Sequence, residues 1–261
     1  MENDNDMIKK ELRTRAVAKE IQNNPSYSVS VLARQFNVSE MTIRRDIKYI
    51  EENNLLDLFQ PSVVREGASV SCAGYEFYRE AEKMADEKLR IARYAVSLIK
   101  PNDVLMMDTG TTVDLVASFL PMDLPLTVIC YNYNVLSHLY DRDNIRLMLA
   151  GGYYHRISES FESSENVSFL QNVRATKMFV STSGVEKLGL TCTSQYEVIT
   201  KQTAIHSSLK RILLADSSKF GVIKSGFFAD LKDMDLIITD EGLSQDWQNY
   251  IQEMNIALKI V

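Results

Sequence analysis

The sequence predicts an α/β protein in two parts, a small helical unit at the N-terminus and a larger unit built on a mainly parallel β-sheet. Apolar side chains recur at helical spacing through residues 7–54. Beyond residue 100, short apolar runs alternate with helix-length segments. Strands that alternate with helices form parallel sheets, because each strand returns to the same edge through a crossover helix.

Composition is that of a folded protein outside the membrane. The chain has 261 residues, of which 45% are hydrophobic and 25% charged, and no apolar run approaches the ~20 residues of a transmembrane helix. Residues 1–6 are polar and acidic, unlike a secretory signal. Cys72, Cys130 and Cys192 have neither metal-ligand nor redox spacing. We therefore expect a cytoplasmic protein with no metal and no cofactor.

Charge is distributed unevenly along the chain. The net charge is −6, which by itself argues against nucleic acid as a partner. Residues 7–50, however, hold nine Lys and Arg against four Asp and Glu, so this segment is +5 and the remainder −11. Because phosphate contacts need a local basic face rather than a basic protein, this segment is a candidate DNA-binding unit.

The N-terminal segment predicts three helices, over residues 7–23, from Val29 (after Ser28) to Phe36, and from Glu40 to about Asn54. The hydroxyl of Ser39 suits the N-cap of the third helix, because it can accept a hydrogen bond from a first-turn N–H. That helix has two different sides. The inner side carries Ile43, Ile47 and Ile50, and the opposite side carries Met41, Arg44, Arg45 and Lys48.

A basic third helix after a short turn is typical of the recognition helix of a helix-turn-helix, whose first residues meet base edges in the major groove. The residues predicted to contact DNA there are Ser39, Met41, Thr42, Arg44 and Arg45. Arg34 and Lys48 are assigned to phosphates, which position a protein without reading sequence. The alternative is a solvated basic face on an ordinary three-helix unit.

A wing and a linker are expected after the third helix. Residues 55–66 place apolar pairs on either side of Gln60-Pro61-Ser62, which favours a β-hairpin. Small residues over 67–74 indicate a linker. The DNA-binding unit is therefore assigned to residues 1–66 and the larger unit to residues 75–261.

The larger unit is expected to begin with a charged helix over residues 75–100 and to continue with seven strands. Helices are predicted between several strands, over residues 113–120, 135–140 and 198–209. The predicted strands are Val104–Met107, Leu126–Cys130, Ile145–Leu149, Met178–Ser181, Ile212–Ala215, Leu236–Thr239 and Ala257–Val261.

Polar and glycine-rich loops follow these strands and gather at the sheet edge where ligands bind. The loop Asp108–Thr112 best suits a phosphate, because Gly110 permits close backbone approach and the next helix presents its first N–H groups. Lys219 adds positive charge, although alone it would pass for a surface lysine. The predicted ligand-binding residues are Asp108, Thr109, Gly110, Thr111, Thr112, Tyr131, Asn132, Gly152, Ser183, Gly184, Glu197 and Lys219.

The run V-S-E-M-T-I-R-R-D-I over residues 38–47 resembles the signature of the DeoR family of bacterial transcriptional regulators. Further matches lie in the larger unit, among them Asp108–Thr112, Gly151-Gly152 and Leu214–Gly221. The resemblance implies a winged helix-turn-helix followed by a sensor domain similar to ribose-5-phosphate isomerase. It also implies that the loops at Asp108 and Lys219 line an effector pocket, with a phosphorylated sugar or a related metabolite as the effector.

Three segments depart from the family pattern. The wing has Phe59–Arg65 where the family has Arg-x-x-Gly-Gly-Ala, which weakens the expectation of wing contacts to DNA. Cys130-Tyr131-Asn132 replaces Thr-Asn-Ser after the second strand, and Ser163 replaces a glycine. The last two lie at the edge of the predicted pocket and favour an unusual ligand.

A sugar-phosphate isomerase is the alternative function. The related isomerases carry Asp-Gly-Ala-Asp where this chain has Thr182–Val185 without a carboxylate. Glu197 and Lys201 resemble another isomerase pair, or at i,i+4 a surface ion pair. We therefore expect no catalytic residues. The expected function is regulation, most simply repression, of a carbohydrate operon by a homo-oligomer, dimer or tetramer, that binds double-stranded operator DNA.

Overall fold

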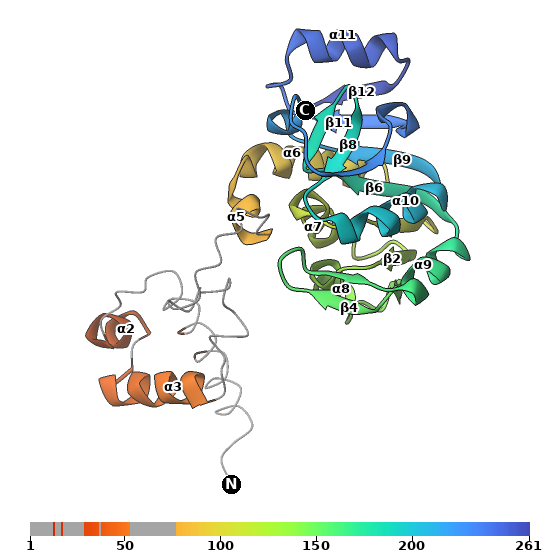
Figure 1. Cartoon of the computed structure of the whole chain (residues 1–261). Helices are drawn as coiled ribbons and strands as arrows, with labels where there is room; N and C mark the ends of the chain where they lie inside the picture. Colours follow the sequence, from red (N-terminus) through yellow and green to blue (C-terminus); the bar gives the residue numbers. More distant parts are fainter. Residues whose placement is uncertain (1–12, 14–16, 18–28, 37, 53–76) are drawn as a thin grey trace. The chain divides into compact units, whose positions relative to one another are not determined.

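The computed structural model describes residues 13, 17, 29–36, 38–52 and 77–261 (Figure 1). The chain divides into two compact units, residues 1–71 and 72–261, which are treated separately below. The predicted wing (55–66), the predicted linker (67–74) and most of the first predicted helix lie outside the described residues.

The smaller unit contains the second and third predicted helices. They are α2, Val29–Gln35, and α3, Glu40–Glu52. Arg13 and Val17, from the first predicted helix, are also helical. Val17, Leu32, Ala33 and Ile43 form a buried cluster, so the inner side predicted for α3 is confirmed at Ile43.

The larger unit is built on one seven-stranded parallel sheet with the order β12-β11-β9-β6-β1-β2-β3. Its strands are the seven that the sequence predicts. Their bounds are β1 Val104–Met107, β2 Leu126–Cys130, β3 Ile145–Leu149, β6 Ala175–Ser181, β9 Ser208–Leu214, β11 Leu236–Thr239 and β12 Ala257–Ile260. β6 and β9 begin earlier than predicted, because polar residues (Thr176 and Lys177 in β6, Lys210 and Arg211 in β9) interrupt the apolar run in the first half of each strand.

Helices cover both faces of this sheet (Figure 1). On one face, Leu105 and Met107 pack with α6 Ala85–Ser97, α7 Thr111–Ser118 and α8 Tyr133–Leu139. On the other face, Met106 packs with α9 Ser164–Gln171, α10 Val198–His206 and α11 Gln245–Glu253. Successive strand residues therefore enter opposite cores, as the side-chain alternation of a strand requires.

Two small antiparallel sheets complete the larger unit and were not predicted. β4 Tyr153–His155 pairs with β5 Ser160–Glu162. β8 Gly189–Cys192 pairs with both β7 Gly184–Glu186 and β10 Gly226–Ala229. At three or four residues each, these strands are too short to produce a recognisable alternation.

The prediction of one continuous helix over residues 75–100 is wrong. The chain forms α5, Phe77–Glu82, and then α6. Met84 between them has φ 51°, in the left-handed region, which ends the first helix. α6 starts with a new phase that turns Lys88 and Ile91 inward, whereas Leu89 and Val96, which were expected inside, are only partly buried.

The order of the strands fixes where a ligand can enter. The chain runs from β1 through β2 to β3 on one side of the sheet and then continues with β6 on the other side of β1. The connections leave β1 and β6 in opposite directions, which opens a crevice beyond their carboxyl ends. Asp108 and Ser181 stand at those two ends.

Two leucines of strand β9, one buried and one exposed, allow a test of which residues of the strand face the core. Leu213 is fully buried and Leu209 is 80% exposed. We expect Leu213→Ala to lower the free energy of unfolding by about 2–5 kcal/mol, because it leaves a cavity in the core. Leu209→Ala should change it by less than about 0.5 kcal/mol. Urea denaturation of both variants measures the difference, and equal losses would contradict the assigned faces.

Candidate functional site

The exposed start of α3 is the candidate DNA-binding surface. The side chains of Met41, Arg44 and Arg45 are exposed there, Met41 by 61%. The N–H of Thr42 donates to the Ser39 hydroxyl at 3.2 Å, and the two hydroxyl oxygens lie 2.9 Å apart. The predicted N-cap is therefore present, and it fixes the first turn of the helix that carries the two arginines.

A buried ion pair helps to keep this surface basic. Asp46 on α3 is 2% exposed and accepts two hydrogen bonds from Arg13, 2.7 Å from Nε and 3.1 Å from Nη2. A carboxylate bound in this bidentate way is neutralised inside the unit. The acidic residue of the R-R-D run thus supports the helix from within and does not oppose the charge of Arg44 and Arg45.

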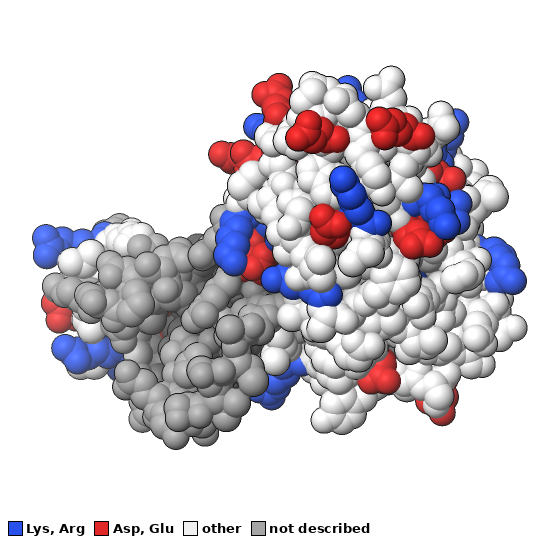
Figure 2. All heavy atoms as spheres, turned by 45° about the horizontal axis from the view of Figure 1, so that its top comes forward, with Lys and Arg blue, Asp and Glu red and all other residues white. Residues whose placement is uncertain are grey.

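The two predicted phosphate contacts are only partly described. Arg34 is exposed in α2. Lys48 belongs to α3, and its side chain lies outside the described residues. In the face shown in Figure 2, the described part of the smaller unit carries basic side chains at its edge with an acidic side chain between them, and acidic and basic side chains are interspersed over the larger unit. The predicted DNA contacts themselves remain predictions.

A partly open pocket lies beyond the carboxyl ends of β1, β6 and β9. It occupies the crevice expected where the chain direction changes. Its lining combines small hydroxyl side chains with charged ones. The lining residues are Glu80, Lys88, Thr109, Gly110, Thr111, Thr112, Ser181, Thr182, Ser183, Cys192, Glu197, Lys201, Leu214, Ala215, Asp216 and Lys219.

The first turn of α7 forms one wall of the pocket. Gly110 precedes this helix with φ 106°, a conformation that glycine adopts without strain, and it supplies no side-chain cap. The backbone N–H groups of the first turn have no acceptor within the helix. Thr111 and Thr112 add hydroxyls to the same wall and are buried. This arrangement suits an oxyanion, as the sequence predicts.

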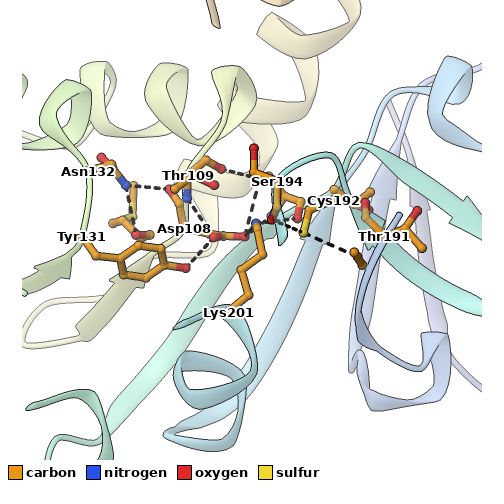
Figure 3. Close-up of polar contacts among 12 residues, drawn as sticks. Asp108, Thr109, Tyr131, Asn132, Thr191, Cys192, Ser194 and Lys201 are labelled. Atoms are coloured by element: carbon orange, nitrogen blue, oxygen red, sulfur yellow. Dashed lines mark hydrogen bonds and ion pairs between the residues drawn. The ribbon is translucent and has the colours of Figure 1, made fainter. Parts of the chain in front are cut away.

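Asp108 lies directly beneath the pocket wall and is completely buried. Its carboxylate accepts hydrogen bonds from the Tyr131 hydroxyl, from the backbone N–H groups of Thr109 and Ser181 at 2.8 Å each, and from Lys201 Nζ at 2.6 Å (Figure 3). All four donors converge on one side chain. Asp108, which was predicted to contact the ligand, is thus placed where it organises the loops around it.

Lys201 and Glu197 on the opposite side of the pocket do not form the surface ion pair that their spacing allowed. Lys201 is 2% exposed and bonded to Asp108. Burial alone would lower the pKa of Lys201, but Asp108 and Glu197 outweigh burial and hold that pKa above its usual value. Burial raises the pKa of Glu197 to about 7, with Asp108 acting in the same direction and Lys201 opposing it. Glu197 is therefore an acid that gains or loses its proton near neutral pH.

Two further lysines line the pocket, and both contact α5. Lys219 Nζ lies 3.0 Å from a carboxylate oxygen of Glu80. Lys88 is 1% exposed and donates to the backbone carbonyl of Glu80. Burial lowers the pKa of Lys88 to about 8, and the nearby Lys219 lowers it further, against the opposing effect of Asp216.

The other predicted ligand-binding residues fall into three groups. Ser183 lines the pocket. Tyr131, Asn132 and Gly184 lie behind its walls: Asn132 caps α8 and donates to the Asp108 carbonyl at 3.0 Å, and a Cβ on Gly184 would lie 2.3 Å from the Val222 carbonyl oxygen. Gly152 lines a separate hollow beside α9. Their predicted ligand contacts remain untested.

Sequence reasoning did not assign a ligand-binding role to Glu80, Lys88 or Lys201. For Lys88 a weak signal exists, since it is a lysine on the apolar side of an amphipathic helix. For Lys201 the sequence offers only the resemblance of Glu197 and Lys201 to an isomerase pair, because α10 has no distinct apolar side. Glu80 has no such signal, because its partner Lys219 is 139 residues away.

Comparisons with known proteins match both units. A model of the DeoR-like helix-turn-helix domain matches residues 13–57, and a model of the DeoR C-terminal sensor domain matches residues 83–241. The deoxyribose operon repressor of Escherichia coli K12 is 28% identical over 96% of this chain and 98% of the relative. The lactose phosphotransferase system repressor of Staphylococcus epidermidis is 32% identical over 87% and 90%.

Similarity to solved structures is more distant. Ribose 5-phosphate isomerase A from Methanocaldococcus jannaschii is 19% identical, over 52% of this chain and 55% of that chain, with a TM-score of 0.39. Within the part of the chain that the structure describes, no cluster of His, Cys, Asp or Glu is arranged to hold a metal ion. The helices described are also too short or too polar to cross a bilayer.

The Asp108–Lys201 pair should contribute to stability, because removal of one partner leaves the other charge buried without a counter-ion. We expect Asp108→Asn to lower the free energy of unfolding by about 3–5 kcal/mol. Asp235→Asn, which breaks the more exposed pair with Arg211 at 2.9 Å, should cost less than about 1 kcal/mol. Chemical denaturation of the two variants distinguishes these cases. A loss in Asp108→Asn as small as in Asp235→Asn would contradict a central role for Asp108.

Proposed function

The chain belongs to the DeoR family of transcriptional regulators, and we propose that it is a repressor of a carbohydrate operon, controlled by a phosphorylated sugar or a related metabolite. Two curated relatives support the operon class, since they are named as repressors of a deoxyribose operon and of a lactose phosphotransferase system. The observation that carries the effector class is the pocket, where the uncapped start of α7 and Lys219 face the same space.

In this proposal α3 enters the major groove of operator DNA. Met41, Arg44 and Arg45 read base edges, together with Ser39 and Thr42 at the start of the helix. Arg34 and Lys48 bind phosphates and set the register. The protein acts in the cytoplasm as a homo-oligomer, dimer or tetramer, because two-fold operators require two copies of the helix.

The proposed effector places its phosphate at the start of α7. The N–H groups of the first turn and the hydroxyls of Thr111 and Thr112 bind its oxygens, and Lys219 supplies positive charge. Glu197 faces the same pocket and is suited to hydrogen bonds with sugar hydroxyls, because a carboxyl group accepts hydrogen bonds in both protonation states and also donates one when protonated. By linkage, an effector that weakens DNA binding must itself bind more weakly when DNA is present.

Arg44 provides the test of the recognition helix. We expect Arg44→Ala to raise the Kd for DNA sites selected by the full wild-type chain by at least about tenfold, since one bidentate arginine–guanine contact contributes about 1–3 kcal/mol. Fluorescence anisotropy at fixed salt measures the Kd. Arg146→Ala, which removes the same charge from the exposed side of β3, serves as the control and should bind as wild type. Equal binding by all three proteins would refute the assignment.

Lys219 provides the test of the pocket. A ligand that binds only the folded state raises the Tm as its concentration increases, so we expect inorganic phosphate or a member of a sugar-phosphate panel to stabilise the wild-type chain. Lys219→Ala should require at least about tenfold more ligand for the same shift, as expected for loss of a charge-assisted hydrogen bond. Lys232→Ala, an exposed lysine paired with Asp230, should respond as wild type. An unchanged response in Lys219→Ala would place the effector elsewhere.

A further inference from the structure

Helix α5 contributes one carboxylate, that of Glu80, to the lining of the pocket. Glu80 binds Lys219 at 3.0 Å through one oxygen and Lys83 at 2.5 Å through the other. Its backbone carbonyl also accepts the hydrogen bond from Lys88. One residue of α5 therefore contacts two of the three lysines that line the described pocket.

The charges around the pocket do not favour an anion while Glu80 is in place. Among the described residues, Lys88, Lys201 and Lys219 face four carboxylates that lie in or directly beneath the pocket, namely Glu80, Asp108, Glu197 and Asp216. Lys201 is already bonded to Asp108. Burial alone would raise the pKa of Glu80, but Lys83 and Lys219 outweigh burial and lower that pKa to about 2, so Glu80 is ionised at neutral pH.

We propose that Glu80 acts as a built-in competitor of the effector: an anionic ligand takes its place on Lys219 and releases α5 from the pocket. The same movement frees Lys88 from the Glu80 carbonyl. Lys88 and Lys219 can then both contact the ligand, and the Glu80 carboxylate no longer repels it. The inference rests on the proposed function, because it takes the pocket as the effector site, and it adds how the ligand changes the protein.

The construction of α5 is consistent with release on ligand binding. The helix has six residues, too few to be stable without tertiary contacts. It is held by Glu80 and by Phe77, which is buried and donates its N–H to the Ile157 carbonyl at 3.3 Å. α5 also packs against α7. Loss of the Glu80 contacts removes the bonds from Lys219 and Lys88 that hold α5 at the pocket.

The position of α5 in the chain connects its release to DNA binding. α5 begins at Phe77, and residues 53–76 connect it to the end of α3 at Glu52. A ligand that releases α5 changes where this connecting segment is anchored to the sensor unit. Coupling between effector and DNA then needs only that DNA binding favours one state of α5.

The test compares phosphate affinity in four full-length proteins: wild type, Glu80→Gln, Glu87→Gln and Lys219→Ala. Glu80→Gln keeps the shape and a hydrogen bond to Lys219 but removes the competing charge, so its Kd for inorganic phosphate should fall about tenfold, because the bond that phosphate must displace is then made by a neutral amide and is weaker than the bond to a carboxylate. Glu87→Gln makes the same change on α6, outside the pocket, and its Kd should stay within about twofold of wild type. Titration calorimetry measures each Kd.

A second measurement uses the wild-type chain alone and does not depend on a variant's folding. Saturating phosphate should increase deuterium uptake across residues 77–83, because α5 is released, and should leave α11 unchanged.

Three results are distinguishable. Tighter binding by Glu80→Gln together with faster exchange in α5 supports displacement. If wild type binds phosphate, Lys219→Ala weakens it and Glu80→Gln binds no more tightly than wild type, displacement is refuted and the pocket assignment stands. If neither wild type nor Glu80→Gln binds phosphate or any sugar phosphate, the proposed effector class fails, and the displacement proposal fails with it.

Discussion

The fold of the larger unit depends on the hydrogen bonds made to one carboxylate, that of Asp108, which has no access to water. Asp108 stands where the connections of β1 and β6 diverge, and its donors come from the loop after β1, from the end of β2, from β6 and from α10. A buried charge that loses its partner costs several kcal/mol, so these four elements can meet in few other ways. The loop Thr109–Thr112 follows Asp108 directly, and its position is fixed by the same bonds. A structural constraint thus shapes the wall that is proposed to hold the effector.

The same constraint determines which cations remain for a ligand. Lys201 is almost completely buried in the pocket, and its charge is balanced by Asp108. An incoming anion must therefore rely on Lys88 and Lys219, and both of these contact Glu80. The smaller unit uses a buried acid in a comparable way, since the Arg13–Asp46 pair leaves the exposed part of α3 to Arg44 and Arg45. In both units, a buried ion pair neutralises some charged side chains, and the charged side chains that remain are those available to a ligand or to DNA.

Much of the fold could be predicted because its signals are local. The five inner strands of the large sheet each contain a run of buried residues that are mainly apolar, and Ser39 precedes α3 at the position of a cap. The edge of the sheet at which the pocket lies could be predicted as well, since parallel strands align their carboxyl ends. The pairs of residues that contact each other inside the pocket could not be predicted. Asp108 and Lys201 are 93 residues apart, and Glu80 and Lys219 are 139 apart, so no spacing rule connects them. Sequence reasoning therefore identified polar residues near the site without distinguishing those that line it from Tyr131, Asn132 and Gly184, which support it.

The distribution of carboxylates also bears on why this pocket suits binding rather than isomerisation. Moving a proton between adjacent carbons needs a free base beside the substrate and further groups that stabilise an enediolate. Asp108 is enclosed by four donors and is not available to a substrate. The segment Thr182–Val185 contributes no acid, and the Thr182 hydroxyl is occupied with the carbonyls of Gly184 and Thr191. Glu197 has a suitable pKa of about 7, but a single carboxylate beside a neutralised lysine provides only part of the required machinery. The pocket contains hydrogen-bond donors for an oxyanion, at the first turn of α7 and at Lys219, and one carboxyl group, that of Glu197. These groups are suited to binding a ligand.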